Sequence, residues 1–346
     1  MHSIVRDWVA VPMALMGAAM LGGCELYFRD GQHDAVDGGA GGTDGGIGTP
    51  DAGRADAGRP DAGRDDSSLD DRWLAFDSDR GGFNRDIYLV RGDGSGLRRL
   101  TTEPSVEMDP AFSHDGRWLA FASDRSGSMQ IHVMDLVTKQ VTQLTFLTRG
   151  ADQPSWHPSD DRIVFHSGPS IYMAAVAGGP PSLIATGLDD FNAYEYPSLS
   201  HNGAEVLFSR KNEIDARALA GGAQRYVVQN WTTTEETPAL SPDGGLVAYA
   251  VGCDGLEVIA VTPFSSHAPD PCATQRVTPP SAGSARRPAW ASSNALAFER
   301  SASSGGSLSS TVISATTAPG AVPFDIVGPP GDHRAPSWAP AGFQPR

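Results

Sequence analysis

Six residues that precede a repeated proline give this chain its clearest pattern suited to binding chemistry. Each stands two positions before a proline that is followed, two residues later, by an aromatic residue or a leucine. Most of them are charged, with acids in the middle of the chain and arginines toward its end: Met108, Asp152, Glu195, Glu236, Arg286 and Arg334. Tyr194 and Trp231 lie nearby in the sequence and add aromatic surface. Charged and aromatic groups brought together in this way predict a recognition site rather than a catalytic one.

Catalysis would need a different constellation, and the sequence lacks one. No Gly-x-Ser-x-Gly elbow, His-Glu-x-x-His pair, phosphate-binding loop or dinucleotide fingerprint is present. The nine histidines are scattered, and the Asp-rich stretch at Gly92 has too few ligands for a calcium loop. The net charge of -15 argues against binding to a phosphate backbone. We therefore expect no enzyme activity, no metal, no cofactor and no nucleic acid.

The prolines themselves indicate which fold must position these residues. They are separated by 44, 43, 41, 50 and 48 residues, a period typical of propellers and other repeat proteins. Each period also contains an apolar run such as LAF, a second run such as IYLV or IHVM, and a run that ends in Leu-Thr. Together these are four short strands in about 45 residues, which is one propeller blade. The six prolines are Pro110, Pro154, Pro197, Pro238, Pro288 and Pro336.

The two ends of the repeat array are complementary. The array starts at Arg72 with an LAF strand and no proline strand before it, and it ends with Pro336 to Trp338 and no LAF strand after it. If the last segment supplies the innermost strand of the first blade, the ring closes without an exposed sheet edge. The sequence thus predicts an all-β, six-bladed propeller of four-stranded blades over residues 72–346, closed by its C-terminal strand and monomeric.

In such a ring, the residues two positions before the prolines lie where the chain enters each innermost strand, around one mouth of the central channel. Loops that converge on a rigid scaffold are common binding sites. One hypothesis is a polarised mouth, acidic through Asp152, Glu195 and Glu236 and basic through Arg286 and Arg334. The alternative is that these charges only form salt bridges between blades.

The first 23 residues read as a secretory signal. Arg6 precedes an apolar run of about 14 residues, which is short for a membrane span. The run ends in Leu-Gly-Gly before Cys24, and this resembles the lipobox of bacterial lipoproteins. The resemblance implies that Cys24 becomes a lipidated first residue that anchors the protein to a membrane of the bacterial envelope, in the periplasm or at the cell surface. Ordinary secretory cleavage with an incidental cysteine is the alternative.

Residues 24–71 are expected to form a disordered tether. They are rich in Gly, Asp and Ala, with Asp-Ala-Gly-Arg repeated at Asp51, Asp56 and Asp61, and have little apolar content to bury. For a Gly-rich chain of this length the r.m.s. reach is roughly 35 to 40 Å. The propeller is thereby held away from the membrane.

Cys253 and Cys272 are the cysteines that remain after lipidation. In an oxidising compartment outside the cytoplasm we expect them to pair around the third strand of the fifth blade.

The repeat of Pro-x-aromatic-Ser-x-Asp-Gly, an LAF run, Ser-Asp-Arg and a closing Leu-Thr resembles that of TolB-type propellers. Ser78-Asp79-Arg80 and Ser123-Asp124-Arg125 match best. The resemblance covers residues 72–342 and implies a six-bladed propeller that acts outside the cytoplasm. TolB carries a further N-terminal α/β domain, and this chain has the tether in its place, so only the propeller is carried over.

We therefore expect a non-catalytic envelope lipoprotein whose propeller binds a protein or another envelope component. Two alternatives remain. One is a propeller enzyme of the lactonase or sugar dehydrogenase type, and the other is a carbohydrate-binding module that uses Trp231 and Tyr194.

Overall fold

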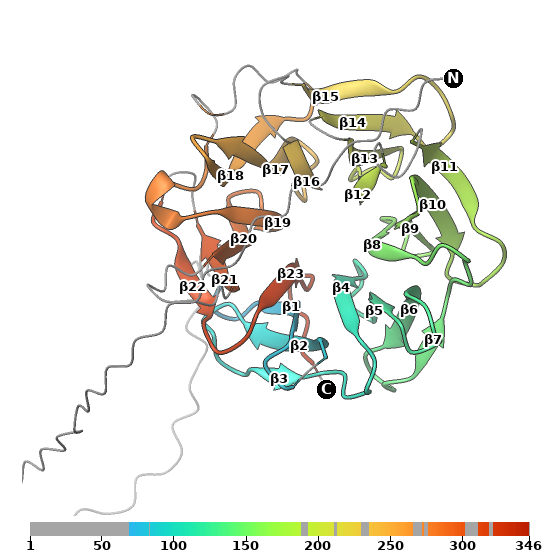
Figure 1. The fold of residues 1–346 in the computed structure, drawn as a ribbon, viewed down its shortest axis with the longest axis horizontal. Coiled ribbons are helices and arrows are strands. Elements are labelled where there is room, and N and C mark those ends of the chain that lie inside the picture. The colour runs from blue at the N-terminus through green and yellow to red at the C-terminus, as the bar shows by residue number, and fades with distance from the viewer. Residues whose placement is uncertain are drawn as a thin grey trace, which may run out of the picture. The chain divides into compact units, whose positions relative to one another are not determined.

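Six antiparallel β-sheets are arranged as blades around a central channel (Figure 1). The computed structural model describes residues 69–345 except 83, 188–192, 211–212, 230–234, 266–271, 273–275, 302–310 and 318–320. The expected signal, Cys24 and nearly all of the tether lie outside the described residues. Within the described part, no helix is long and apolar enough to cross a membrane. The all-β six-bladed propeller predicted from the repeat is confirmed.

The blades follow one another along the chain, and each begins with its innermost strand except the first. Blade one contains β23 (His333–Trp338), β1 (Trp73–Ser78), β2 (Asp86–Arg91) and β3 (Arg98–Arg99). Blade two contains β4 (Glu107–Phe112), β5 (Trp118–Ser123), β6 (Gln130–Asp135) and β7 (Val141–Gln143). Blade three contains β8 (Asp152–Trp156), β9 (Arg162–Ser167), β10 (Ser170–Ala175) and β11 (Ser182–Thr186).

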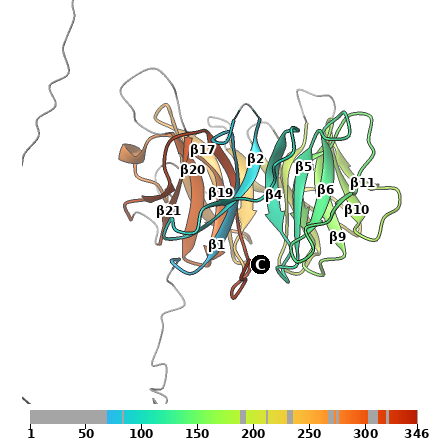
Figure 2. The same ribbon diagram turned by 90° about the horizontal axis from the view of Figure 1, so that it is seen from below.

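The remaining three blades complete the ring. Blade four contains β12 (Glu195–Leu199), β13 (Glu205–Arg210), β14 (Glu213–Ala218) and β15 (Arg225–Gln229). Blade five contains β16 (Glu235–Leu240), β17 (Leu246–Cys253) and β18 (Leu256–Pro263). Blade six contains β19 (Ala285–Ser292), β20 (Ala295–Ser301), β21 (Thr311–Thr316) and β22 (Phe324–Val327). Figure 2 shows the blades from the side.

The predicted closure of the ring is confirmed. β23 pairs antiparallel with β1, placing Trp338 opposite Leu74 and His333 opposite Ser78. Trp338 is buried in the core cluster that also contains Leu74 and Phe76. The last strand of the chain is therefore the innermost strand of blade one.

The repeated LAF run forms the second strand of each blade because its aromatic residue fills the space between neighbouring blades. This side chain is fully buried in all six blades, and burial of a large aromatic side chain is among the strongest contributions to a protein core. The six equivalent residues are Phe76, Phe121, Phe165, Phe208, Tyr249 and Phe298.

Blade five departs from the expectation of four strands. Among the described residues its sheet has three strands, and the fourth is reduced to a single bridge between Ala260 and Arg276. Val277 still donates its backbone N–H to the carbonyl of Ile259, at 2.7 Å.

A disulfide joins Cys253, at the end of β17, to Cys272, and so brackets β18. The Cα atoms are 5.6 Å apart, and the two cysteines are separated by 19 residues in the sequence. Cys253 is buried and Cys272 packs against the same core cluster.

A variant with Cys253→Ala and Cys272→Ala is expected to be less stable by roughly 3 kcal/mol, because the unfolded chain regains the entropy of an open loop. Thermal unfolding of the variant and the unreduced wild-type protein measures the difference. Reductant should lower the melting temperature of the wild type and leave the variant unchanged. An equal response of both proteins to reductant would contradict the expectation.

Candidate functional site

Six non-glycine residues with left-handed backbone line the channel, one in each blade. Each directly precedes the repeated proline, and their φ angles lie between 48° and 55°. This region is uncommon for residues other than glycine. In every blade the strand register shifts at this residue, which makes a bulge in the innermost strand. The six residues are Asp109, Gln153, Tyr196, Thr237, Arg287 and Ala335.

The bulge directs these residues into the channel. Together with the six prolines, they line a cavity of about 160 Å³ at the middle of the channel. Four of their backbone N–H groups donate hydrogen bonds to a side chain of the preceding blade. The pairs are Asp109 to Asp77 at 3.2 Å, Tyr196 to Gln153 at 2.7 Å, Arg287 to Thr237 at 3.3 Å, and Ala335 to Glu299 at 2.7 Å.

Arg287 crosses the channel and forms the centre of a buried ion cluster. From blade six its Nη1 lies 3.2 Å from Oδ1 of Asp109 in blade two and 3.5 Å from Oε1 of Glu299. Its guanidinium also lies over the ring of Tyr196, 5.6 Å from the centroid. Burial raises the pKa of both acids even though Arg287 opposes the change. Burial also disfavours the charge of Arg287, but Asp109 and Glu299 raise its pKa.

A second group of charged residues, centred on Arg85, extends the cluster into blade one. Arg85 donates from Nε to Asp77, at 2.5 Å, and from Nη1 to Asp332, at 3.1 Å. Asp77 is 1% exposed, and burial raises its pKa to about 6 despite the charge of Arg85. The charged side chains of blades one, two and six are therefore joined in one network.

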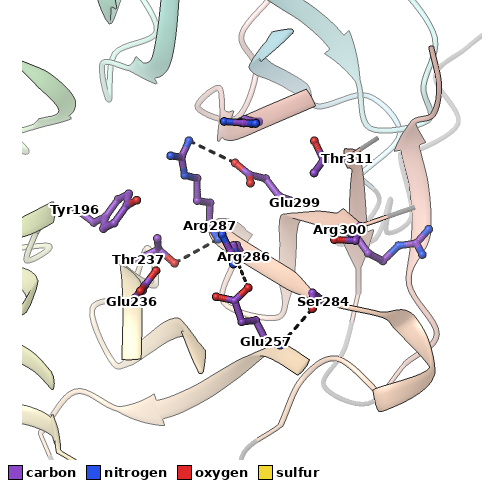
Figure 3. A pocket seen from close by; sticks show the side chains of 12 residues that line it. Tyr196, Glu236, Thr237, Glu257, Ser284, Arg286, Arg287, Glu299, Arg300 and Thr311 are labelled. Carbon is purple, nitrogen blue, oxygen red and sulfur yellow. Dashed lines mark hydrogen bonds and ion pairs between the residues drawn. The ribbon is translucent and has the colours of Figure 1, made fainter. Parts of the chain in front are cut away.

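The front mouth of the channel, where the innermost strands begin, opens into a cavity of about 340 Å³ (Figure 3). It lies against blades five, six and one. Tyr196, Thr237 and Arg287 also line the channel cavity, so the two cavities are neighbours. Its other lining residues are Glu236, Glu257, Ser284, Arg286, Glu299, Arg300, Ser301, Thr311 and Arg334.

The structure gathers three of the sequence-predicted site residues around this cavity: Glu236, Arg286 and Arg334. Arg286 pairs with Glu257, and Arg334 pairs with Asp332 at 2.6 Å. Burial, together with the nearby charge of Glu257, raises the pKa of Glu236. Among the described residues, the Glu236 carboxylate has no ion pair.

The other predicted residues do not line this cavity. Asp152 begins β8 and accepts a hydrogen bond from Nδ1 of His166, at 2.7 Å. Burial opposes the charge of His166, but Asp152 raises its pKa. Glu195 begins β12, and its side chain has no ion pair within the part of the chain that the structure describes. Met108, the uncharged member, is the second residue of β4 and packs against a core cluster.

Of the two aromatic residues, Tyr194 is not part of the mouth surface. It is 8% exposed and stacks on Phe208 with ring centroids 4.6 Å apart, because the space beside β13 needs a large apolar side chain. Trp231 lies outside the described residues.

The rear mouth, where the innermost strands end, opens into a second cavity of about 680 Å³. Trp290, Trp338 and Phe112 form part of its wall. Histidines of the turns in this region link adjacent blades: His157 Nε2 lies 3.3 Å from the carbonyl oxygen of Gly203. No group of three or more His, Cys, Asp or Glu side chains among the described residues is arranged to hold a metal ion.

The residue directly before each proline was missed as a channel residue. The feature of the sequence that could have indicated this role is the variety of residue types at one fixed repeat position, from Ala335 to Arg287. Residues before proline favour extended backbone, so a left-handed conformation that turns the side chain into the channel was not expected at this position.

Comparison with known proteins agrees with this architecture. A family model described as the TolB beta propeller domain matches residues 66–220. The chain is similar to the Tol-Pal system protein TolB of Francisella tularensis subsp. mediasiatica, with 28% identity over 190 residues, covering 51% of this chain and 42% of that protein. It is also similar to a protein TolB homolog of Chlorobium luteolum, with 34% identity over 67 residues, 19% of this chain and 14% of the relative. The chain thus matches less than half the length of these relatives.

Among solved structures, TolB from Acinetobacter baumannii is similar with a TM-score of 0.67 and 15% identity, covering 79% of this chain and 68% of that chain. At this identity the likeness concerns the fold.

Proposed function

Because the chain is a TolB-like six-bladed propeller, we propose that it is a non-catalytic, exported lipoprotein that binds a protein of the bacterial cell envelope through the front mouth. Cys24 carries the lipid anchor, residues 24–71 form the tether, and the propeller presents its mouth to the partner. The relative from Francisella is named as a Tol-Pal system protein, which supports a place in the envelope and a protein partner.

The observation that carries the proposal is a contrast between the residues that build the blades and the residues that line the front mouth. The prolines, bulges and buried aromatic residues repeat in the blades, whereas the residues that open into the front cavity differ in charge from blade to blade. One of these charges also joins two blades, because Arg286 of β19 pairs with Glu257 of β18. A mouth with Glu236 and Glu257 on blade five and with Arg286 and Arg334 on blades six and one suits electrostatic recognition of one partner in one orientation.

The front mouth is also better suited to recognition than to catalysis. Its most exposed charged groups, Arg286 and Arg334, are paired with Glu257 and Asp332. No histidine is among the residues that line the cavity, so no hydroxyl there has the histidine base of a Ser-His pair. The carbohydrate alternative loses one of its two aromatic residues, because Tyr194 is buried.

Affinity capture from detergent-solubilised membranes tests the proposal. Full-length protein should retain a specific envelope protein, and a variant with Asp152→Ala, Glu195→Ala and Glu236→Ala should retain at least about tenfold less of it, because several charged contacts are lost together. A variant at the rear mouth, Ser293→Ala with His201→Ala, is the matched control and should bind like the wild type. Undiminished capture by the triple variant would exclude the acidic half of the front mouth as the binding site.

A further inference from the structure

The basic half of the front mouth presents two guanidinium groups from neighbouring innermost strands. Arg286 on β19 and Arg334 on β23 are the second residues of their strands and line the same cavity. Their side chains are 56% and 47% exposed. In Figure 3 a dashed line joins Arg286 to Glu257, while the guanidinium of Arg300 points away from the other labelled residues.

Two of the three carboxylates that line the cavity are less exposed than these guanidinium groups and are engaged in ion pairs, whereas the third, Glu236, has no ion pair among the described residues. The Glu257 side chain is 21% exposed and pairs with Arg286. The Glu299 side chain is 8% exposed, pairs with Arg287 and accepts the backbone N–H of Ala335. A group that enters from solvent therefore meets the two exposed arginines before it meets these two acids.

The two arginines retain hydrogen-bonding capacity. A guanidinium group has five N–H donors in a planar fork. The described contacts engage Nε of Arg286 with Glu257 and Nη2 of Arg334 with Asp332. Within the described residues, the other nitrogens of these two side chains have no hydrogen-bond partner. Ion pairs at this exposure contribute little stability, so an added carboxylate can share the guanidinium groups at small cost.

We propose that Arg286 and Arg334 together clamp a carboxylate of the partner protein in the front cavity. This inference rests on the proposed function and names the chemistry of the partner group. A planar carboxylate matches the guanidinium fork through paired N–H···O contacts, which gives the interaction directionality. The neighbouring cavity then accommodates the peptide that carries it.

Titration of the full-length protein with short peptides at low ionic strength tests the clamp. The probes are an acetylated Gly-Ser-Ala peptide with a free C-terminal carboxylate, the same peptide as its C-terminal amide, and an amidated Gly-Glu-Ala peptide. Chemical shifts of the Arg286 and Arg334 Nε–H groups report binding. At least one carboxylate probe should bind with a dissociation constant of about 1 mM or lower, and the amide without a carboxylate should not. The tighter of the two carboxylate probes identifies a chain terminus or an acidic side chain as the source.

Arg286→Gln and Arg334→Gln should each weaken binding by about tenfold or more, and added salt should weaken it further. Arg162→Gln lies outside the cavity and is the matched control, so it should leave the binding of the carboxylate probes unchanged. The clamp would be overturned if the amide probe bound as tightly as the carboxylate probes, or if neither substitution weakened binding. It would also be overturned if inorganic phosphate bound and the carboxylate probes did not. If membrane capture persists while no carboxylate probe binds, the proposed function stands and the clamp fails. If the probes bind but no envelope protein is captured, the clamp stands and the proposed function fails.

Discussion

Removal of residues 335–346 is expected to abolish the cooperative unfolding transition of the propeller at ordinary temperature. The deletion takes most of β23, so β1 loses its inner neighbour and blade one loses Trp338 from its core. Loss of a buried tryptophan alone costs about 3 to 5 kcal/mol. A domain of ordinary stability has about 5 to 15 kcal/mol in total, and the deletion also opens the ring.

The contacts that join blade one to blade two disappear with the same segment. The hydroxyl of Ser337 accepts the backbone N–H of Phe112 at 3.3 Å, and Phe343 packs edge to face on Phe112 with centroids 5.2 Å apart. The effect should therefore spread beyond the first blade, and circular dichroism with thermal melting measures it.

A chain shortened only by residues 344–346 is the matched control, because it keeps β23 and Phe343. It should melt like the full-length protein. A common melting temperature for both truncated chains and the full-length protein would contradict ring closure as the source of stability.

Replacement of Arg287 by methionine is expected to cost about 3 to 5 kcal/mol of folding stability, because it leaves buried carboxylates without their cation. Asp109 and Glu299 both lose the guanidinium that now partly offsets their burial. Methionine keeps the aliphatic part of the side chain and removes the guanidinium group, so the loss includes both charge and packing.

The sign of the pH dependence separates this cause from a general loss of packing. Burial already raises the pKa values of Asp109 and Glu299, and without Arg287 these values rise further. The stabilising effect of Arg287 is therefore present at neutral pH, where the carboxylates are ionised, and is lost as the pH falls and they become protonated. The deficit of the variant should be larger at pH 7.5 than at pH 5.

Thermal or urea unfolding at the two pH values measures both effects. Arg287→Lys retains the charge and should recover part of the stability, while Arg162→Met, outside the channel, should change it little. A deficit of equal size at both pH values would show that lost packing explains the variant.

Much of the fold was predictable because the same sequence pattern, with the same buried side chains, recurs in the blades. A proline two residues before an aromatic or leucine residue, followed by a buried LAF-type strand, appears often enough to fix the period and the number of blades. The orphaned Pro336 segment was enough to predict closure onto β1. The outermost strand was less predictable, since it is short, two to five residues where it is present, and pairs with a neighbouring strand on one side only. In blade five it shrinks to the contacts of Arg276 and Val277.

The site was predictable only in part. The repeat placed Glu236, Arg286 and Arg334 around one mouth, because a position in the repeat becomes a position around the ring. The cluster of Arg287, Asp109 and Asp77 could not be foreseen, since it depends on a bulge and on contacts between blades one, two and six. Tyr194 shows the opposite error: closeness in sequence to the mouth did not reveal that its ring fills the core.

The left-handed residue before each proline has a consequence for how such a protein can diversify. Its backbone conformation is set by the bulge and held by hydrogen bonds from the neighbouring blade, whereas its side chain projects into the channel and varies from Ala335 to Tyr196. Side chains of different size and charge can therefore occupy these six sites on one backbone frame, provided that the partners of a charge such as Arg287 change with it. The interior of the channel can thus acquire a new chemistry without a change in the course of the backbone.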